Sequence, residues 1–132
     1  MRILVPYAPP ARPPGRAGGA AAGPAERRRA HALYAMIIRR RPHPDPERQR
    51  ETRQRSDDEF FPQLRQAPGF IAFYLVAGDD GLTTATIVWE DRAKAEAFQP
   101  TLDDWTTTLE RLGNWPVSRT AGEVLAAVTP RP

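Results

Sequence analysis

The chain has 132 residues, of which 40% are hydrophobic, 15 are proline and none is cysteine. This length fits one domain and excludes a separate cofactor domain. The lack of cysteine excludes disulfide bonds, a thiolate nucleophile and cysteine-ligated zinc or iron–sulfur centres, and two histidines are too few for a histidine-rich metal site. No apolar run approaches the roughly 18–20 residues that span a bilayer, so we expect a cytoplasmic protein that does not enter membranes.

Positive charge is concentrated in the first part of the chain. Residues 1–55 contain 13 arginines and 4 acidic residues, whereas the formal net charge of the whole chain is only +3. Arginine runs of this kind fit either a surface for anions or nucleic acid, or a solvated face that contacts the acidic second half. Aromatic side chains, which single-strand binding requires, do not interleave the arginines. We therefore favour the solvated face and expect no nucleic-acid partner.

Residues 1–31 differ in composition from the rest of the chain. Proline, glycine, alanine and arginine dominate them, and no periodic apolar pattern runs through them. Such a segment cannot recover its ordering entropy by burial. We interpret residues 1–31 as a disordered extension, either a tether or an over-extended start of the reading frame. Residues 32–128 are expected to form one folded domain, and residues 129–132 a tail.

The first half of the domain predicts a strand and a helix. Leu33–Ile38 is a short continuous apolar run, typical of a buried strand, and the polar, proline-rich stretch after it is a connection. Asp45 before Pro46 resembles an N-cap followed by proline in the first helical position, so a helix is expected from there to about Gln66. The Pro-Gly pair that follows is a stop signal for this helix.

The second half predicts a hairpin, a helix and a last strand. Strands are expected over Phe70–Val76 and Leu82–Trp89, joined by an acidic turn bounded by glycines. Asp91 is the expected N-cap of the second helix, whose apolar side chains recur on one face. Those side chains are Phe98, Leu102, Trp105, Leu109 and Leu112. Pro100 is expected to split this helix, and the last strand is expected over Val117–Val128.

This order, β-α-β-β-α-β, is that of the ferredoxin-like fold of the α+β class, with two helices on one face of a four-stranded antiparallel sheet. In the second strand, two opposed sets of side chains are both apolar. These are Phe70, Ala72, Tyr74 and Val76 on one side and Ile71, Phe73 and Leu75 on the other. Because helices cover only one face, the other face needs a cover. We predict a homodimer with the two sheets packed face to face, a dimeric α+β barrel; the alternative is a monomer covered by its N-terminal tail.

Several motifs carry a resemblance to a known family. The segment Arg65–Phe70 reads RQAPGF, an acidic glycine hairpin follows the next strand, and Val88–Asp91 reads VWED before an alanine-rich helix start. Over residues 32–128 this pattern resembles the antibiotic biosynthesis monooxygenase family. The resemblance implies a dimeric barrel. In some members it implies an oxygenase without metal, flavin or haem, in which an aromatic substrate lies between helices and sheet and, once deprotonated, itself passes an electron to oxygen.

The resemblance therefore implies a small cofactor-independent monooxygenase that acts on an aromatic or polyketide-like metabolite. The alternative is a non-catalytic dimer of the same fold that binds a small hydrophobic metabolite. The haem-degrading branch of the fold is less compatible with this chain. By spacing, the second tryptophan and the iron-ligating histidine of that branch correspond here to Phe98 and Thr108, so no haem is expected at that position.

A site of this type needs aromatic walls and hydrogen bonds to substrate oxygens. The aromatic candidates for the pocket are Tyr34, Tyr74, Trp89 and Trp105. The face that Tyr74 occupies depends on the register of the hairpin, since a slip of one residue reverses it. Trp115, beside a proline, is expected to be a packing plug at the end of the second helix.

The first helix supplies the polar candidates. Gln49, Thr52 and Ser56 continue the face of Phe60 and Leu64 toward the N-terminus, where a helix that lies on a sheet normally carries leucine or valine. Either a polar, water-filled cleft lies beneath these residues or the helix end frays.

Other polar clusters predict little chemistry. The paired carboxylates lie in a turn or on separate helix faces and do not form an acid–base dyad. No phosphate-binding glycine loop or metal-binding motif is present, and no metal is expected. His43, in the proline-rich connection, is expected to be solvated, with no neighbour to orient it.

Overall fold

A computed structural model describes residues 32–130. The predicted extension 1–31 and the last two residues of the predicted tail lie outside the described residues. The strands are β1 (Tyr34–Arg41), β2 (Phe70–Ala77), β3 (Thr83–Trp89) and β4 (Trp115–Glu123). The helices are α2 (Pro46–Arg55), α3 (Phe61–Gln66) and α4 (Arg92–Arg111), and a π-helical turn, Ser56–Phe60, joins α2 to α3 without a break.

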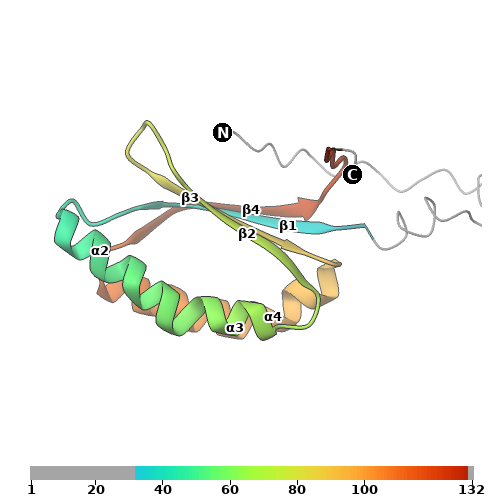
Figure 1. Ribbon diagram of the computed structural model, residues 1–132, viewed down its shortest axis with the longest axis horizontal. Coiled ribbons are helices and arrows are strands. Elements are labelled where there is room, and N and C mark those ends of the chain that lie inside the picture. Colours follow the sequence, from blue (N-terminus) through green and yellow to red (C-terminus); the bar gives the residue numbers. More distant parts are fainter. Residues whose placement is uncertain (1–31, 131–132) are drawn as a thin grey trace, which may run out of the picture.

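The four strands form one sheet in the order β2-β3-β1-β4, and all neighbours are antiparallel. The helices lie together on one face of this sheet (Figure 1). The predicted ferredoxin-like α+β fold is therefore confirmed.

Both predicted helix caps are present. Asp45 Oδ1 accepts a hydrogen bond from the Glu47 N–H at 3.0 Å, and Asp91 Oδ1 accepts one from the Lys94 N–H at 2.9 Å. These contacts satisfy N–H groups that have no partner inside the helix. After α3, Gly69 adopts a φ of 79° in the turn that the Pro-Gly pair predicts.

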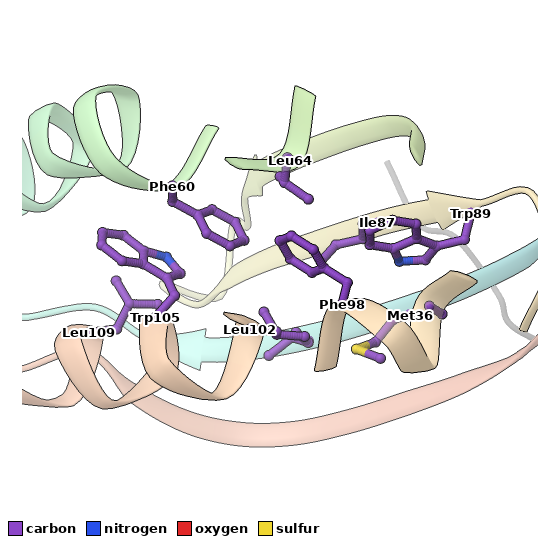
Figure 2. Close-up of a cluster of buried hydrophobic side chains, with 11 residues drawn as sticks. Met36, Phe60, Leu64, Ile87, Trp89, Phe98, Leu102, Trp105 and Leu109 are labelled. Atoms are coloured by element: carbon purple, nitrogen blue, oxygen red, sulfur yellow. The ribbon is translucent and has the colours of Figure 1, made fainter. Parts of the chain in front are cut away.

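The core lies between the helices and the sheet, where side chains from β1, β3, α4 and the first helical segment meet (Figure 2). Its buried members are Met36, Ile38, Phe60, Leu64, Ile87, Trp89, Ala95, Phe98, Leu102, Trp105 and Leu109. Four of the five residues in the predicted apolar stripe of α4 belong to this core, and the fifth, Leu112, is half-buried. The period of the sequence thus identifies the packed face of α4 correctly.

The strand boundaries differ from the prediction. β1 runs to Arg41 because β3 and β4 flank it and continue its ladders through the arginines. β4 begins at Trp115, which is 55% exposed and is therefore not a packing plug. The strand ends at Glu123 rather than Val128, since β1 offers only the Leu33 carbonyl beyond it, which accepts from the Val124 N–H.

The predicted break of the second helix at Pro100 is wrong, and a second proline, Pro62, affects the first helix instead. Pro100 lies on the exposed side of α4, which remains one continuous helix because neighbouring turns are anchored in the core. In the first helix, Pro62 lacks the N–H that would bond to the carbonyl four residues earlier. There the helix widens, and the Phe61 N–H bonds to the Ser56 carbonyl, five residues back.

A bulge in β2 changes which of its side chains share a face, so the predicted faces of this strand are partly wrong. The ladder with β3 slips between Phe70 and Ala72, so Phe70 joins Phe73 and Leu75 on the side of the helices instead of opposing them. Tyr74 faces away from the helices, opposite Thr86 of β3, and is 54% exposed. The helix-free face carries small and β-branched side chains at its centre. Because successive side chains of a strand point to opposite faces, β1 and β3 place Ala35, Ile37, Thr86 and Val88 on this face.

The end of α4 is closed by a glycine. Gly113 has a φ of 81°, its N–H bonds to the Glu110 carbonyl, and the Asn114 N–H bonds to the Leu109 carbonyl. This is a Schellman arrangement. A Cβ atom on Gly113 would lie 2.5 Å from His43 Cδ2, so the glycine provides both the backbone conformation and the space for the imidazole.

We predict that Gly113→Ala destabilises the fold more than Gly81→Ala. Both glycines have nearly the same positive φ, 81° and 82°, which costs an alanine about 1–2 kcal/mol. A Cβ on Gly81 meets nothing within 4 Å. The additional loss of unfolding free energy in Gly113→Ala therefore measures the cost of displacing His43. Urea unfolding of the two variants gives the comparison, and equal losses would show that the imidazole yields freely.

Candidate functional site

A cavity of about 100 Å³ lies under α2, between the helices and the helix-facing side of the sheet. Its lining combines polar residues from α2 and the chain around it with aromatic and aliphatic residues from the core. The polar members are Arg40, His43, Gln49, Thr52, Arg53, Ser56, Thr83 and Asn114. The apolar members are Ile38, Pro42, Phe60, Phe61, Phe73, Leu75, Ala85, Ile87, Leu102, Trp105 and Leu109.

The cavity exists because α2 has nothing apolar to pack. Its sequence, PERQRETRQR, contains no large hydrophobic residue, and none of its side chains is buried. Gln49 and Arg53 are exposed on one side and line the cavity on the other, so the cavity opens to solvent beside α2. Of the two explanations offered by the sequence, a polar cleft or a fraying helix end, the structure does not show the frayed end, since the helix begins at Pro46 with Asp45 as its N-cap.

The hydroxyl groups on this wall donate to their own helix. Thr52 Oγ1 donates to the Arg48 carbonyl at 2.9 Å, and Ser56 Oγ donates to the Thr52 carbonyl at 2.8 Å. A hydroxyl has one proton and two lone pairs. Toward the cavity, both groups are therefore available as acceptors.

An aromatic wall closes the cavity on the core side. The rings of Phe60 and Trp105 stack with centroids 5.3 Å apart and planes 6° from parallel, and Figure 2 shows them facing one another between the helices. Phe73 meets Phe60 at 6.2 Å and Phe61 at 5.1 Å. Rings in these arrangements attract one another beyond their area burial, and they present flat faces and edges to anything in the cavity.

Arg40 brings a buried positive charge to the cavity. It is only 7% exposed, its Nη2 donates to Thr106 Oγ1 at 3.0 Å, and its Nη1 has no hydrogen-bond partner. Burial lowers the pKa of the guanidinium below its usual value; Glu110 acts against this change and Arg119 adds to it. The group remains protonated at neutral pH because arginine titrates far higher.

A second unsatisfied group, Asn114 Oδ1, lies in the same lining. The Schellman turn after α4 places Asn114 there, and pairing of Arg40 with Pro116 brings the two chain segments together at this end of the sheet. A buried polar atom without a partner is costly. Arg40 and Asn114, which both line the cavity, each carry one such atom.

His43 is the cavity residue that the sequence reading missed. It is half-buried rather than solvated, and its Nδ1 accepts a hydrogen bond from the Asp45 N–H at 3.0 Å. The expectation that nothing orients it is therefore wrong. The signal was present in the sequence, since a histidine two residues before an N-cap can accept from the backbone of the cap.

Arg40 was missed for a different reason. The sequence reading treated the run Arg39–Arg41 as solvated charge, but strand alternation separates its members. Arg39 pairs with Asp80, Arg40 turns toward α4, and Arg41 is exposed. Extending the period of β1 by three residues would have placed Arg40 among the core positions.

The predicted pocket residues fall into two groups. Gln49, Thr52, Ser56 and Trp105 all line this cavity. The other three lie elsewhere. Tyr34 packs half-buried against the core, Tyr74 belongs to the helix-free side of β2, and Trp89 is 1% exposed between Phe70 and Phe98.

A second, more open pocket of about 380 Å³ lies beside β2 and includes Tyr74 and Arg65 in its lining. Among residues 32–130, no three histidine or acidic side chains gather in a way that could hold a metal ion. In the same residues, no helix combines the length and the apolar character needed to cross a membrane.

Solved structures with this fold include oxygenases. The monooxygenase ActVA-Orf6 of Streptomyces coelicolor, in complex with nanaomycin D, aligns with a TM-score of 0.57 and 18% identity, over 76% of this chain and 93% of that chain. SnoaB of Streptomyces nogalater, a cofactor-independent oxygenase, aligns with a TM-score of 0.52 and 18% identity, over 74% and 96%. A dimeric ferredoxin-like protein from an uncultured marine organism aligns with a TM-score of 0.57 and 14% identity, over 74% of this chain and 99% of that chain.

These similarities establish a shared fold. The resemblance expected from the sequence is thereby confirmed at the level of architecture, which the chain shares with proteins of the antibiotic biosynthesis monooxygenase type. No family model matches the chain, and no curated protein sequence matches it.

We predict that Arg40→Met leaves the fold intact or stabilises it. The unpaired, desolvated guanidinium opposes folding, and replacement of a buried charge by an apolar chain of similar length is often neutral or favourable. The expected change in the free energy of unfolding lies between zero and about +1 kcal/mol, measured in urea beside Arg39→Met as the exposed control. A loss above about 2 kcal/mol would assign Arg40 a mainly structural role.

Proposed function

We propose that this protein is a small cofactor-independent monooxygenase of the antibiotic biosynthesis monooxygenase type, acting on an aromatic, polyketide-like metabolite. The observation that carries the proposal is the buried guanidinium of Arg40, a residue that lines an aromatic-walled cavity between helices and sheet and whose Nη1 has no hydrogen-bond partner. The fold shared with ActVA-Orf6 and SnoaB supports it.

The cavity suits a phenol or enol that reacts as its anion. The charged side chains in the lining, Arg40 and Arg53, are both positive, and none of the lining residues is a carboxylate. A fixed positive charge in a site of low dielectric favours the ionised form of a bound phenol. The acceptor oxygens of Thr52 and Ser56 are placed to bind other hydroxyl groups of a polyhydroxylated ring system.

The reaction needs no external reductant. The substrate loses a proton to water at the open side of the cavity, and its anion gives one electron to O₂. The resulting substrate radical and superoxide combine to a carbon-bound peroxide. Loss of water then converts a ring CH₂ group to C=O, so that one oxygen atom enters the product and the other leaves as water. The protein binds the anion, fixes its orientation and limits access of water.

We further propose a homodimer formed through the helix-free face of the sheet. Ile37 and Val88 lie half-buried on this face, and Tyr74 is 54% exposed there. A second sheet would cover these groups. One of the proteins that share the fold is described as dimeric.

A non-catalytic role is the second candidate. None of the residues that line the cavity is a tyrosine or a carboxylate that could accept a proton from a substrate. This composition favours a dimer that binds a small hydrophobic metabolite without converting it.

Oxygen uptake tests the catalytic proposal. We predict that purified protein, with no added metal or flavin, consumes O₂ with anthrone- or naphthol-type substrates, and that Arg40→Gln lowers kcat/KM about 10²-fold, as expected for loss of an anion-stabilising donor. Arg39→Gln, on the opposite face of the same strand, is the control. Uptake that is unchanged in Arg40→Gln contradicts the proposal, and ligand binding without uptake favours the non-catalytic candidate.

Light scattering tests the dimer. The wild-type protein is expected at roughly twice its chain mass of 14.7 kDa at micromolar concentration, and Ile37→Asp is expected as a monomer because it places a charge in an apolar interface. Ala97→Asp, on the exposed surface of α4, is expected to stay dimeric, and circular dichroism verifies folding of both. A monomeric wild-type protein contradicts the proposed assembly.

A further inference from the structure

His43 is held in one orientation by its surroundings. Its Nδ1 accepts from the Asp45 N–H at 3.0 Å, and its backbone carbonyl accepts from Gln49 Nε2 at 2.8 Å. Its Cδ2 edge lies against Gly113, where no Cβ atom fits. Prolines on both sides, Pro42 and Pro44, restrict the backbone further.

This arrangement fixes the tautomer. An imidazole nitrogen that accepts a hydrogen bond carries no proton, so the proton of the neutral ring is on Nε2. Protonation of Nδ1 would set two N–H groups against each other, with Asp45 N–H facing the new proton. Arg40 and Arg53, from β1 and α2, are the charged side chains that line the cavity with His43.

We propose that His43 donates a hydrogen bond from Nε2 to the substrate oxyanion and does not act as a proton acceptor. Arg40, which lines the same cavity, supplies a fixed positive charge on the side of the anion. This inference rests on the proposed function, because it assigns the polar end of the same cavity. His43 and Arg40 are three residues apart at the end of β1, and both belong to the lining.

Substitutions at position 43 separate a donor from a base. The amide of glutamine carries an N–H but accepts no proton at neutral pH, so His43→Gln keeps a donor near the place of Nε2 and removes any base. His43→Ala removes both. A donor role therefore predicts that glutamine rescues function and alanine does not, whereas a base role predicts that both variants fail alike.

The measurement uses a chromophoric nitronaphthol whose absorbance changes when its hydroxyl ionises. With wild-type protein, ionisation of the bound probe is expected at lower pH than in water. His43→Ala is expected to weaken binding of the naphtholate about 10- to 100-fold, the range for a hydrogen bond to a charged group. His43→Gln is expected to bind the naphtholate with an affinity within about threefold of that of the wild type. The neutral methyl ether of the probe, as control ligand, should bind all three proteins equally.

Nitrogen NMR of the histidine ring gives an independent readout. For the neutral ring, the proposal expects the proton on Nε2 and none on Nδ1, with a change at Nε2 when the naphtholate binds. A proton on Nδ1 overturns the proposal. So does equal loss of naphtholate binding in the glutamine and alanine variants, or a wild-type protein that binds the methyl ether as tightly as the anion.

The outcome is separable from that of the oxygenase proposal, because probe binding and NMR need no O₂ consumption. Selective binding of the anion that is lost in His43→Ala and kept in His43→Gln, without oxygen uptake, supports the donor role of His43 and refutes catalysis. Oxygen uptake with no difference among the position-43 variants supports catalysis and refutes the donor role.

Discussion

The absence of apolar residues from α2 is the constraint on which the candidate site depends. A helix packs on a sheet through an apolar stripe, and in the first helical segment this stripe begins only at Phe60, the last residue of the π-helical turn. Phe60 stacks on Trp105 and contacts Phe73 and Phe98. The segment is therefore anchored by its second half, while α2 extends over the sheet without packing on it. The unfilled space beneath α2 is the cavity.

Polar groups collect in this space for the same reason. Arg40 and Asn114 would be expensive to bury against leucine side chains, and Arg40 instead donates to the hydroxyl of Thr106 on α4. Even so, Nη1 of Arg40 and Oδ1 of Asn114 lack partners. Features that cost stability without a compensating contact commonly mark functional sites. The candidate site is thus the part of the molecule where packing and function make opposite demands.

The sequence predicted the fold because its strongest signals are local. The stripe on α4, the caps at Asp45 and Asp91 and the turn at Gly69 each act over a few residues, and each is present in the structure. The face of Tyr74 could not be read in the same way, since the bulge in β2 depends on pairing with β3. The same applies to the far end of β4, which stops where its partner strand does.

The candidate site was predicted in part. Gln49, Thr52 and Ser56 could be found because polar residues stood where the helical period demanded apolar ones. Arg40 and His43 could not be found in that way, because their positions depend on contacts with distant residues, Thr106 on α4 and Gly113 after it. Patterns of one element identify what that element faces, but they do not reveal which side chains from other elements it meets.

The π-helical turn also bears on how proteins of this fold could diverge. A π turn holds one residue more than the α-helical turn it replaces, and one residue corresponds to a rotation of about 100° around a helix axis. Loss of a single residue from 56–59, ahead of Phe60, would turn the whole of α2 by that angle while the aromatic anchor behind it stayed in place. The cavity would then be roofed by a neighbouring face of α2, rich in arginine and glutamate. Ligand preference in this architecture can thus change through one deletion, with every side chain of the aromatic wall retained.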